Sequence, residues 1–199
     1  MALVLMCLAA AMVIISICCL VYWDPTPSYT IREDRVGTIP PAPNPEPEAE
    51  TWTRYDVPLS DEVQRYISAQ CREHGLSVPL VLAVIEKESD YDTELVGDGG
   101  KSWGLMQIYA TEHIRRCVDL GSWNLLDPCH NVRVGIDYLA ELMATRNVIS
   151  ALMAYNAGPA AADEQLAAGV RHTDYTDYVL ARAKQIALTG EEVGMDVSQ

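Results

Sequence analysis

Two carboxylates, Glu86 and Glu88, stand at the end of a strongly apolar stretch of the chain. Residues 80–85 are apolar on every face of a helix, so we expect a buried, central helix there. A carboxyl group at the end of such a helix is partly removed from water, which raises its pKa. A carboxyl group with a raised pKa can donate a proton near neutral pH, as a general acid must. Because the two residues are two positions apart, they point to different sides of the helix, and their position alone does not say which one faces a cleft.

Four short motifs that could carry chemistry follow one another along the chain, and the first of them contains Glu88. The four motifs are Glu88-Ser89, Gly104-Leu105-Met106-Gln107-Ile108, Ala154-Tyr155-Asn156-Ala157-Gly158 and Tyr178-Val179. In this order and spacing the sequence resembles the lytic transglycosylase family, relatives of goose-type lysozyme that cut peptidoglycan. The resemblance covers about residues 78–184, where Asp127-Pro128, Asn131, Gly135 and Tyr138-Leu139 also look like the family's middle helix.

The resemblance implies a role for each matching residue. Glu88 matches the family's catalytic acid and base, which protonates the glycosidic oxygen and then takes a proton from the sugar. Ser89 would orient the Glu88 carboxyl or touch substrate, although a local hydrogen bond at the helix end would also explain a serine there. Gln107 would bind sugar or steady Glu88, or else tie its loop to the core. Met106 would line the sugar cleft, although a methionine also suits plain packing.

The last two motifs are implied to complete the cleft. Tyr155 and Asn156 would lie in its floor, with Asn156 bonding an acetamido or hydroxyl group of the sugar. Asn156 also suits the end of a helix beside Gly158, and both roles are compatible. Tyr178 would lie close to Glu88 and set its geometry, although its spacing alone marks only an apolar position on the last helix.

The number of catalytic carboxylates separates three hypotheses about function. Most glycosidases use two carboxylates. The resemblance to lytic transglycosylases implies only one, because the C6 hydroxyl of the substrate closes a 1,6-anhydro ring on N-acetylmuramic acid and proximity replaces the second carboxylate. Asp98, in a glycine-rich loop, stands where goose-type lysozymes have an aspartate and would make the protein a hydrolase by positioning water; we favour a turn aspartate that bonds local backbone. A non-catalytic glycan-binding module is the third hypothesis.

The elements that must position these residues are predicted to be mainly helical, as in an α+β lysozyme-like fold. Ser60 is expected to cap a helix over residues 61–74 that ends at Gly75. Residues 91–102 are expected to form a loop or a small irregular hairpin beside the cleft, because they contain several glycines and aspartates. Later helices are expected from Asp127, over residues 150–156, and from Thr173 to near residue 189.

The chain is predicted to have four parts. Residues 1–23 carry no charge and are predicted to form a membrane anchor, or a signal peptide, and residues 24–58 a proline-rich extended linker. Residues 59–189 are predicted to form the catalytic domain, and residues 190–199 a flexible tail. This order predicts a single-pass protein of the cell membrane with its catalytic domain on the cell-wall side. Secretion after signal cleavage is the alternative.

Composition excludes several classes of partner. The 199 residues include 14 Lys and Arg against 28 Asp and Glu, a net charge of −14, which argues against nucleic acid. No zinc-type Cys and His spacing and no glycine-rich phosphate loop occur, so neither a metal nor a cofactor is expected. The expected partners are peptidoglycan strands, the membrane, and cell-wall or secretion machinery. Cys117 and Cys129 suit a disulfide, but three reduced thiols, with Cys71, fit equally well.

Overall fold

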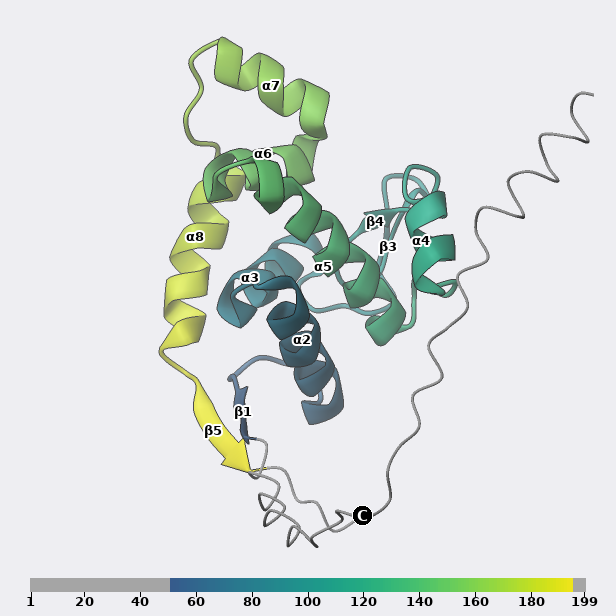
Figure 1. The fold of residues 1–199 in the computed structure, drawn as a ribbon, viewed down its shortest axis with the longest axis vertical. Coiled ribbons are helices and arrows are strands. Elements are labelled where there is room, and N and C mark those ends of the chain that lie inside the picture. The colour runs from purple at the N-terminus through teal and green to yellow at the C-terminus, as the bar shows by residue number, and fades with distance from the viewer. Residues whose placement is uncertain (1–50, 195–199) are drawn as a thin grey trace, which may run out of the picture. The chain divides into compact units, whose positions relative to one another are not determined.

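The computed structural model describes residues 51–194, which fold mainly as helices (Figure 1). The helices of this part are α2 (Asp61–His74), α3 (Val78–Ser89), α4 (Ile114–Leu120), α5 (Pro128–Thr145), α6 (Val148–Ala157), α7 (Pro159–Ala167) and α8 (Asp174–Ala187). The strands are β1 (Thr51–Arg54), β2 (Val96–Gly97), β3 (Ser102–Trp103), β4 (Ile108–Tyr109) and β5 (Glu191–Gly194). This confirms the prediction of a mainly helical, lysozyme-like fold with a small hairpin.

Local capping explains where the helices begin and end. The Ser60 hydroxyl accepts a hydrogen bond from the backbone of Val63, and Gly75 ends α2 in the left-handed conformation, with φ 68°. Thr173 caps α8 in the same way by accepting from the backbone of Thr176. The predicted bounds of α2 and the predicted start of α8 are therefore confirmed, and α8 ends at Ala187, two residues before the expected end.

Helix α3 is the centre of the core, as its sequence predicts. All six residues from Leu80 to Ile85 are buried, and α2, α5, α6 and α8 contribute buried side chains to the same cluster. Figure 1 shows α3 enclosed by α2, α5 and α8. Each large apolar side chain removed from water here contributes about 1.5–3 kcal/mol, so the C-terminal turn of α3 is carried on a firmly packed support.

Two small antiparallel sheets complete the described part of the chain. Strands β2, β3 and β4 pair in that order, with Val96 opposite Trp103 and Ser102 opposite Tyr109. They form the hairpin that the glycine-rich loop predicts and continue it into residues 108–109. Strands β1 and β5 pair with each other, with Thr51 opposite Gly194.

The pairing of β1 with β5 changes two expected boundaries, the end of the linker and the start of the tail. Residues 51–54 were expected to be linker and residues 191–194 tail, yet the two segments form one sheet. Trp52 is buried there under the guanidinium of Arg65, which lies 5.7 Å from the ring centroid. The alternation of threonine with Trp52 and Arg54 suits a half-buried strand.

Two other expectations concern the membrane anchor and the state of the cysteines. The predicted anchor, residues 1–23, and the linker as far as residue 50 lie outside the described residues. Between residues 51 and 194, no helix has both the length and the apolar character needed to cross a membrane. Cys71, Cys117 and Cys129 are all free thiols, so the structure takes the reduced alternative rather than a Cys117–Cys129 disulfide.

Candidate active site

A cleft of about 570 Å³ opens where the C-terminal ends of α3 and α6 meet the hairpin and α5. Five residues singled out in the sequence line it: Glu88, Asp98, Gln107, Tyr155 and Asn156. They come from four separate segments of the chain, so the fold brings together most of the site that the motifs predict. Ser89, Met106 and Tyr178 are not among the residues that line the cleft.

Glu88 lies half-buried at the last turn of α3 and faces this cleft. Burial raises the pKa of its carboxyl group to about 7, and the nearby charge of Asp98 adds to the rise. A hydrogen bond from Tyr175 and the charge of Lys87 act in the opposite direction and lower the pKa. A carboxyl group with this pKa exists in both protonation states near neutral pH, as a residue that gives and then takes a proton must.

Glu86 takes the opposite electrostatic role on the same helix. Burial alone would raise its pKa, but hydrogen bonds from Tyr178, Arg182 and Tyr91 outweigh burial and lower the pKa. Arg182 Nε lies 2.8 Å from both carboxylate oxygens, and the Tyr178 hydroxyl lies 2.7 Å from Oε1. Glu86 therefore stays ionised while Glu88 can hold a proton, which answers the question that sequence position leaves open.

Tyr175, and not Tyr178, is the tyrosine that contacts Glu88. The Tyr175 hydroxyl donates to Glu88 Oε1 at 2.6 Å, whereas the Tyr178 hydroxyl donates to Glu86. The expected place of Tyr178 beside Glu88 is therefore corrected. The two tyrosines lie one turn apart on the same face of α8, and the position of α8 along α3 decides which of them reaches Glu88. That position depends on tertiary packing and leaves no local signal.

Ser89 and Met106 have structural rather than cleft-lining positions. The buried Ser89 hydroxyl lies 2.8 Å from the carbonyl oxygen of Leu105 and 3.1 Å from that of Ile85, so it ties the end of α3 to the next loop. The Met106 side chain is fully buried against Gly135, where an added Cβ would lie 2.4 Å from its sulfur atom. The expected lining of the cleft by Met106 is therefore wrong, because its side chain points into the core.

Gln107 turns a tight corner at the cleft wall. Its φ of 45° is in the left-handed region, and its side-chain amide donates to the carbonyl oxygens of Gly104 and Leu95 at 2.9 and 3.2 Å. An added Cβ at Gly97 would lie 2.3 Å from Gln107 Oε1, so the glycine makes room for this side chain. Gln107 thus ties the loop together and also lines the cleft.

Tyr155 and three further rings form an aromatic wall of the cleft. The Tyr155 hydroxyl donates to the carbonyl oxygen of Met106 at 2.9 Å, and its ring lies 5.5 Å from that of Tyr138. The Tyr138 ring in turn lies 4.4 Å from His113, whose pKa is lowered by burial and by the nearby charge of Arg116. Tyr109 also lines the cleft. Aromatic faces of this kind suit stacking on sugar rings.

The sequence reasoning missed much of this wall. Tyr138 was matched only as part of a helix, and His113 and Tyr109 carried no motif. Asn156 is exposed at the mouth of the cleft beside Gly158, where both of its expected roles are open to it. Within residues 51–194, no group of three His, Cys, Asp or Glu side chains could hold a metal ion.

Asp98 shares the cleft but is engaged in the hairpin. Its backbone φ is 48°, and its Oδ2 accepts a hydrogen bond from the Ser102 hydroxyl at 2.7 Å. This bond spans the tight turn between β2 and β3, and it joins two side chains, whereas we expected a bond to local backbone. Its charge nevertheless reaches Glu88.

A Tyr175→Phe variant tests the hydrogen bond to Glu88. The bond favours the charged carboxylate, so its loss should raise the pKa of Glu88 and move the basic limb of activity to higher pH. We also expect kcat to fall roughly tenfold, because the carboxyl group loses its orientation. Turnover measured across pH checks both effects. The control is Tyr66→Phe, at a partly buried tyrosine that is not among the residues lining the cleft. An unshifted pH profile would contradict the assigned bond.

Comparisons with known proteins identify a family model and a solved structure that this chain resembles. The family model described as the transglycosylase SLT domain matches residues 65–176, which include Glu88, the hairpin and the aromatic wall. The structure also resembles that of the lytic transglycosylase Slt from Pseudomonas aeruginosa, solved as an inactive mutant in which a glutamate is replaced by glutamine. The TM-score is 0.56 at 22% identity, and the match covers 66% of this chain but only 24% of that one. At this identity the likeness supports the fold.

Proposed function

Because the chain belongs to the transglycosylase SLT-domain family, we propose that it cleaves peptidoglycan strands as a lytic transglycosylase with Glu88 as its acid and base. The observation that carries the proposal is the cleft carboxyl group with a pKa of about 7, fixed by a tyrosine and faced by an aromatic wall. The chain matches about a quarter of the length of the Slt structure. The activity of that whole protein is therefore not carried over, and the substrate is proposed only for the matched domain.

The reaction follows from a single carboxyl group that works twice. Protonated Glu88 gives its proton to the oxygen of the β-1,4 bond between N-acetylmuramic acid and N-acetylglucosamine, and the bond from C1 to that oxygen breaks. The resulting carboxylate takes the proton of the C6 hydroxyl as that oxygen bonds to C1 and closes the 1,6-anhydro ring. The N-acetyl group assists at C1. Glu88 ends protonated and no water is consumed, so one carboxyl group with a near-neutral pKa is sufficient.

Hydrolysis is the second candidate function because Asp98 lines the same cleft as Glu88. In that reaction Asp98 would position a water molecule in place of the C6 hydroxyl, as in a goose-type lysozyme. One Asp98 oxygen already accepts the Ser102 hydroxyl and holds the turn, which favours the transglycosylase. A non-catalytic glycan-binding module is the least supported candidate, because such a module needs no carboxyl group with a pKa near 7.

The proposed location is the cell membrane, with residues 1–23 as a single-pass anchor and the cleft on the cell-wall side. The acidic chain carries a net charge of −14 and peptidoglycan is anionic, so long-range attraction does not bring them together. An anchor would supply local concentration instead. Secretion after signal cleavage and docking to secretion machinery stay alternatives, which cell fractionation separates.

Mass spectrometry of purified peptidoglycan digested with the full chain tests the proposed reaction. Muropeptides that lack one water and have no reducing muramic end are expected, because the anhydro ring forms without water. Reducing muramic ends would favour the lysozyme instead. A folded protein that binds strands and releases no product would favour the binding module.

An Asp98→Asn variant separates the two enzymes further. We expect anhydro products to persist, because the C6 hydroxyl needs no help from Asp98. We also expect the pKa of Glu88 to fall, because the negative charge of Asp98 helps to raise it, so the basic limb of activity should move to lower pH. Turnover across pH and product masses provide the measurement, with Asp92→Asn on an exposed loop position as control. Complete loss of cleavage would point to hydrolysis through Asp98.

A further inference from the structure

Glu86 is the centre of a hydrogen-bonded group that the proposed reaction does not use. We name Glu86, Tyr91, Tyr178 and Arg182 the Glu86 cluster. Its four bonds to the Glu86 carboxylate come from Arg182 Nε, which contacts both oxygens, and from the hydroxyls of Tyr178 and Tyr91, the latter at 3.0 Å. The Glu86 side chain is only 12% exposed, and each oxygen accepts two of these bonds. So complete a set of partners indicates that the Glu86 carboxylate is held in a fixed position.

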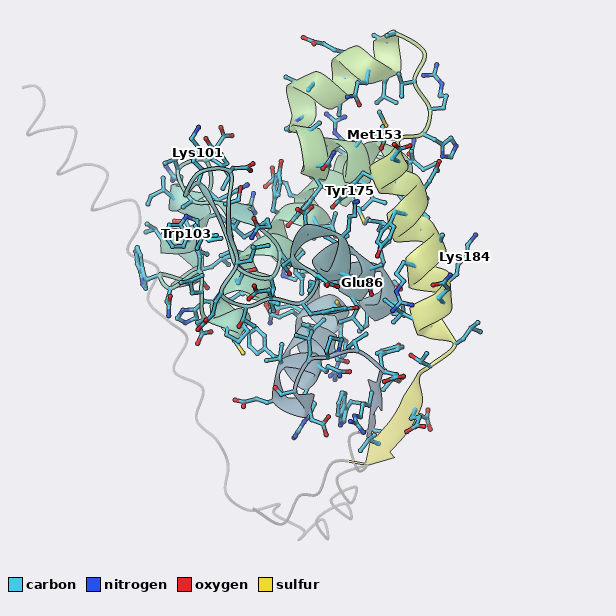
Figure 2. All side chains as sticks on the ribbon, turned by 180° about the vertical axis from the view of Figure 1, so that it is seen from behind. Glu86, Lys101, Trp103, Met153, Tyr175 and Lys184 are labelled. Atoms are coloured by element: carbon cyan, nitrogen blue, oxygen red, sulfur yellow. The ribbon has the colours of Figure 1, made fainter. Side chains whose placement is uncertain are left out.

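The cluster joins three segments around Glu88. Glu86 lies on α3, two residues before Glu88; Tyr91 lies in the turn after α3; Tyr178 and Arg182 lie on α8. On α8, Tyr175, Tyr178 and Arg182 follow one another at three and four residues, which places them on one face of the helix. Figure 2 shows Glu86 and Tyr175 in the region between α3 and α8, and Lys184 on the outer side of α8. One helix face therefore bonds both carboxylates of α3.

The backbone after α3 also depends on the cluster. Asp90 and Tyr91 have φ of 51° and 66°, two consecutive non-glycine residues in the left-handed region. Non-glycine residues in this region are strained and persist only where surrounding contacts hold them. The buried Tyr91 ring and its bond to Glu86 supply that hold. This turn begins the segment that carries Asp98 into the cleft.

We propose that the Glu86–Arg182 ion pair positions Tyr175 on Glu88, so that Glu86 and Arg182 are positioning residues for the acid. The inference rests on the proposed function of Glu88. The pair fixes how far α8 lies along α3, and this distance decides whether Tyr175 reaches the Glu88 carboxyl group. Neither Glu86 nor Arg182 lines the cleft, so both act only through Tyr175.

The groups that face Glu88 define what a variant should change. Tyr175 reaches it from α8, Tyr155 from α6, Asp98 from the hairpin and Lys87 from α3. Removal of the Arg182 guanidinium weakens the Tyr175 bond to Glu88. Because that bond favours the charged form of Glu88, its weakening raises the pKa of the carboxyl group.

Arg182→Gln in the full chain tests the proposal through the titration of the Glu88 carboxyl carbon, followed by NMR and assigned with Glu88→Gln. We expect the Glu88 titration to move to higher pH and kcat to fall roughly tenfold with little change in KM. Arg182→Lys keeps the charge and should restore part of both effects. Lys184→Gln removes a charge from the exposed side of α8 and should change neither.

A double variant distinguishes positioning from general stability. Tyr175→Phe with Arg182→Gln should lose little more than Tyr175→Phe alone, because the ion pair acts through a bond that is already absent. Fully additive losses, or an unmoved Glu88 titration in a folded Arg182→Gln protein, would overturn the proposal. If the wild-type chain cleaves no peptidoglycan, the proposed function fails, while the NMR titration still tests the positioning.

Discussion

Replacement of Glu88 by glutamine is expected to abolish cleavage and, at the same time, to make the protein more stable above neutral pH. Glutamine has the shape of glutamate but has no proton to give, so turnover should fall by roughly 10³-fold or more. Stability should move the other way because the site keeps an acid partly away from water. The carboxylate form is costly there, and burial raises its pKa from 4.5 to about 7.

The sign of the stability change follows from the protons that each state holds. Between pH 4.5 and about 7 the unfolded chain has released the Glu88 proton, whereas the folded chain still binds it. The free energy of unfolding therefore falls as pH rises through this interval. At about 1.4 kcal/mol for each pH unit, the loss in the wild type amounts to roughly 3 kcal/mol by pH 8. Glutamine does not ionise, so the variant escapes this loss, while at pH 4 the two proteins should be similarly stable.

Urea unfolding at pH 4 and pH 8, beside a peptidoglycan digest, measures both halves of this prediction. Glu164→Gln, at an exposed position on α7, is the matched control and should change neither stability nor turnover appreciably. A Glu88→Gln protein that still releases anhydro products would show that Glu88 is not the catalytic acid and base. Equal stability of variant and wild type at pH 8 would show that the Glu88 pKa is not raised.

Local signals in the sequence account for the helices and for the identity of the acid. Ser60, Gly75 and Thr173 predict helix ends because capping depends on a few neighbouring residues. The apolar run at residues 80–85 predicts a buried α3 because no other place suits it. The family resemblance supplies Glu88, Gln107, Tyr155 and Asn156, all of which line the cleft.

Contacts between distant segments account for what sequence reasoning missed. Tyr175 and Tyr178 lie on the same face of α8, and the relative position of two helices decides which one reaches Glu88. Met106 belongs to a cleft motif but faces Gly135, 29 residues later, which has no side chain and so leaves it room. Trp52 sits beside a proline-rich segment, and its strand exists only because β5 pairs with it.

Asn131, on α5, illustrates how much of the cleft rests on a single buried side chain. Its Oδ1 accepts from the backbone of Met106 at 2.8 Å, and its Nδ2 donates to the carbonyl oxygens of Trp103 and Leu125 at 2.7 and 2.9 Å. The residue is fully buried, and Gly104, at φ 67°, leaves no room for a Cβ beside its amide. These bonds hold the loop that carries Gln107 and accepts the Tyr155 hydroxyl.

Asn131→Ala should therefore lower the free energy of unfolding by about 4 kcal/mol, because buried backbone groups lose their partner at about 1–3 kcal/mol each. Turnover should fall as well, since the loop that holds the cleft wall loses its attachment to α5. Urea denaturation compares this variant with Asn124→Ala, an exposed asparagine whose loss should cost less than about 1 kcal/mol. If Asn131→Ala costs no more than Asn124→Ala, the loop is held by packing of Leu105 and Met106, and the polar attachment described here is dispensable.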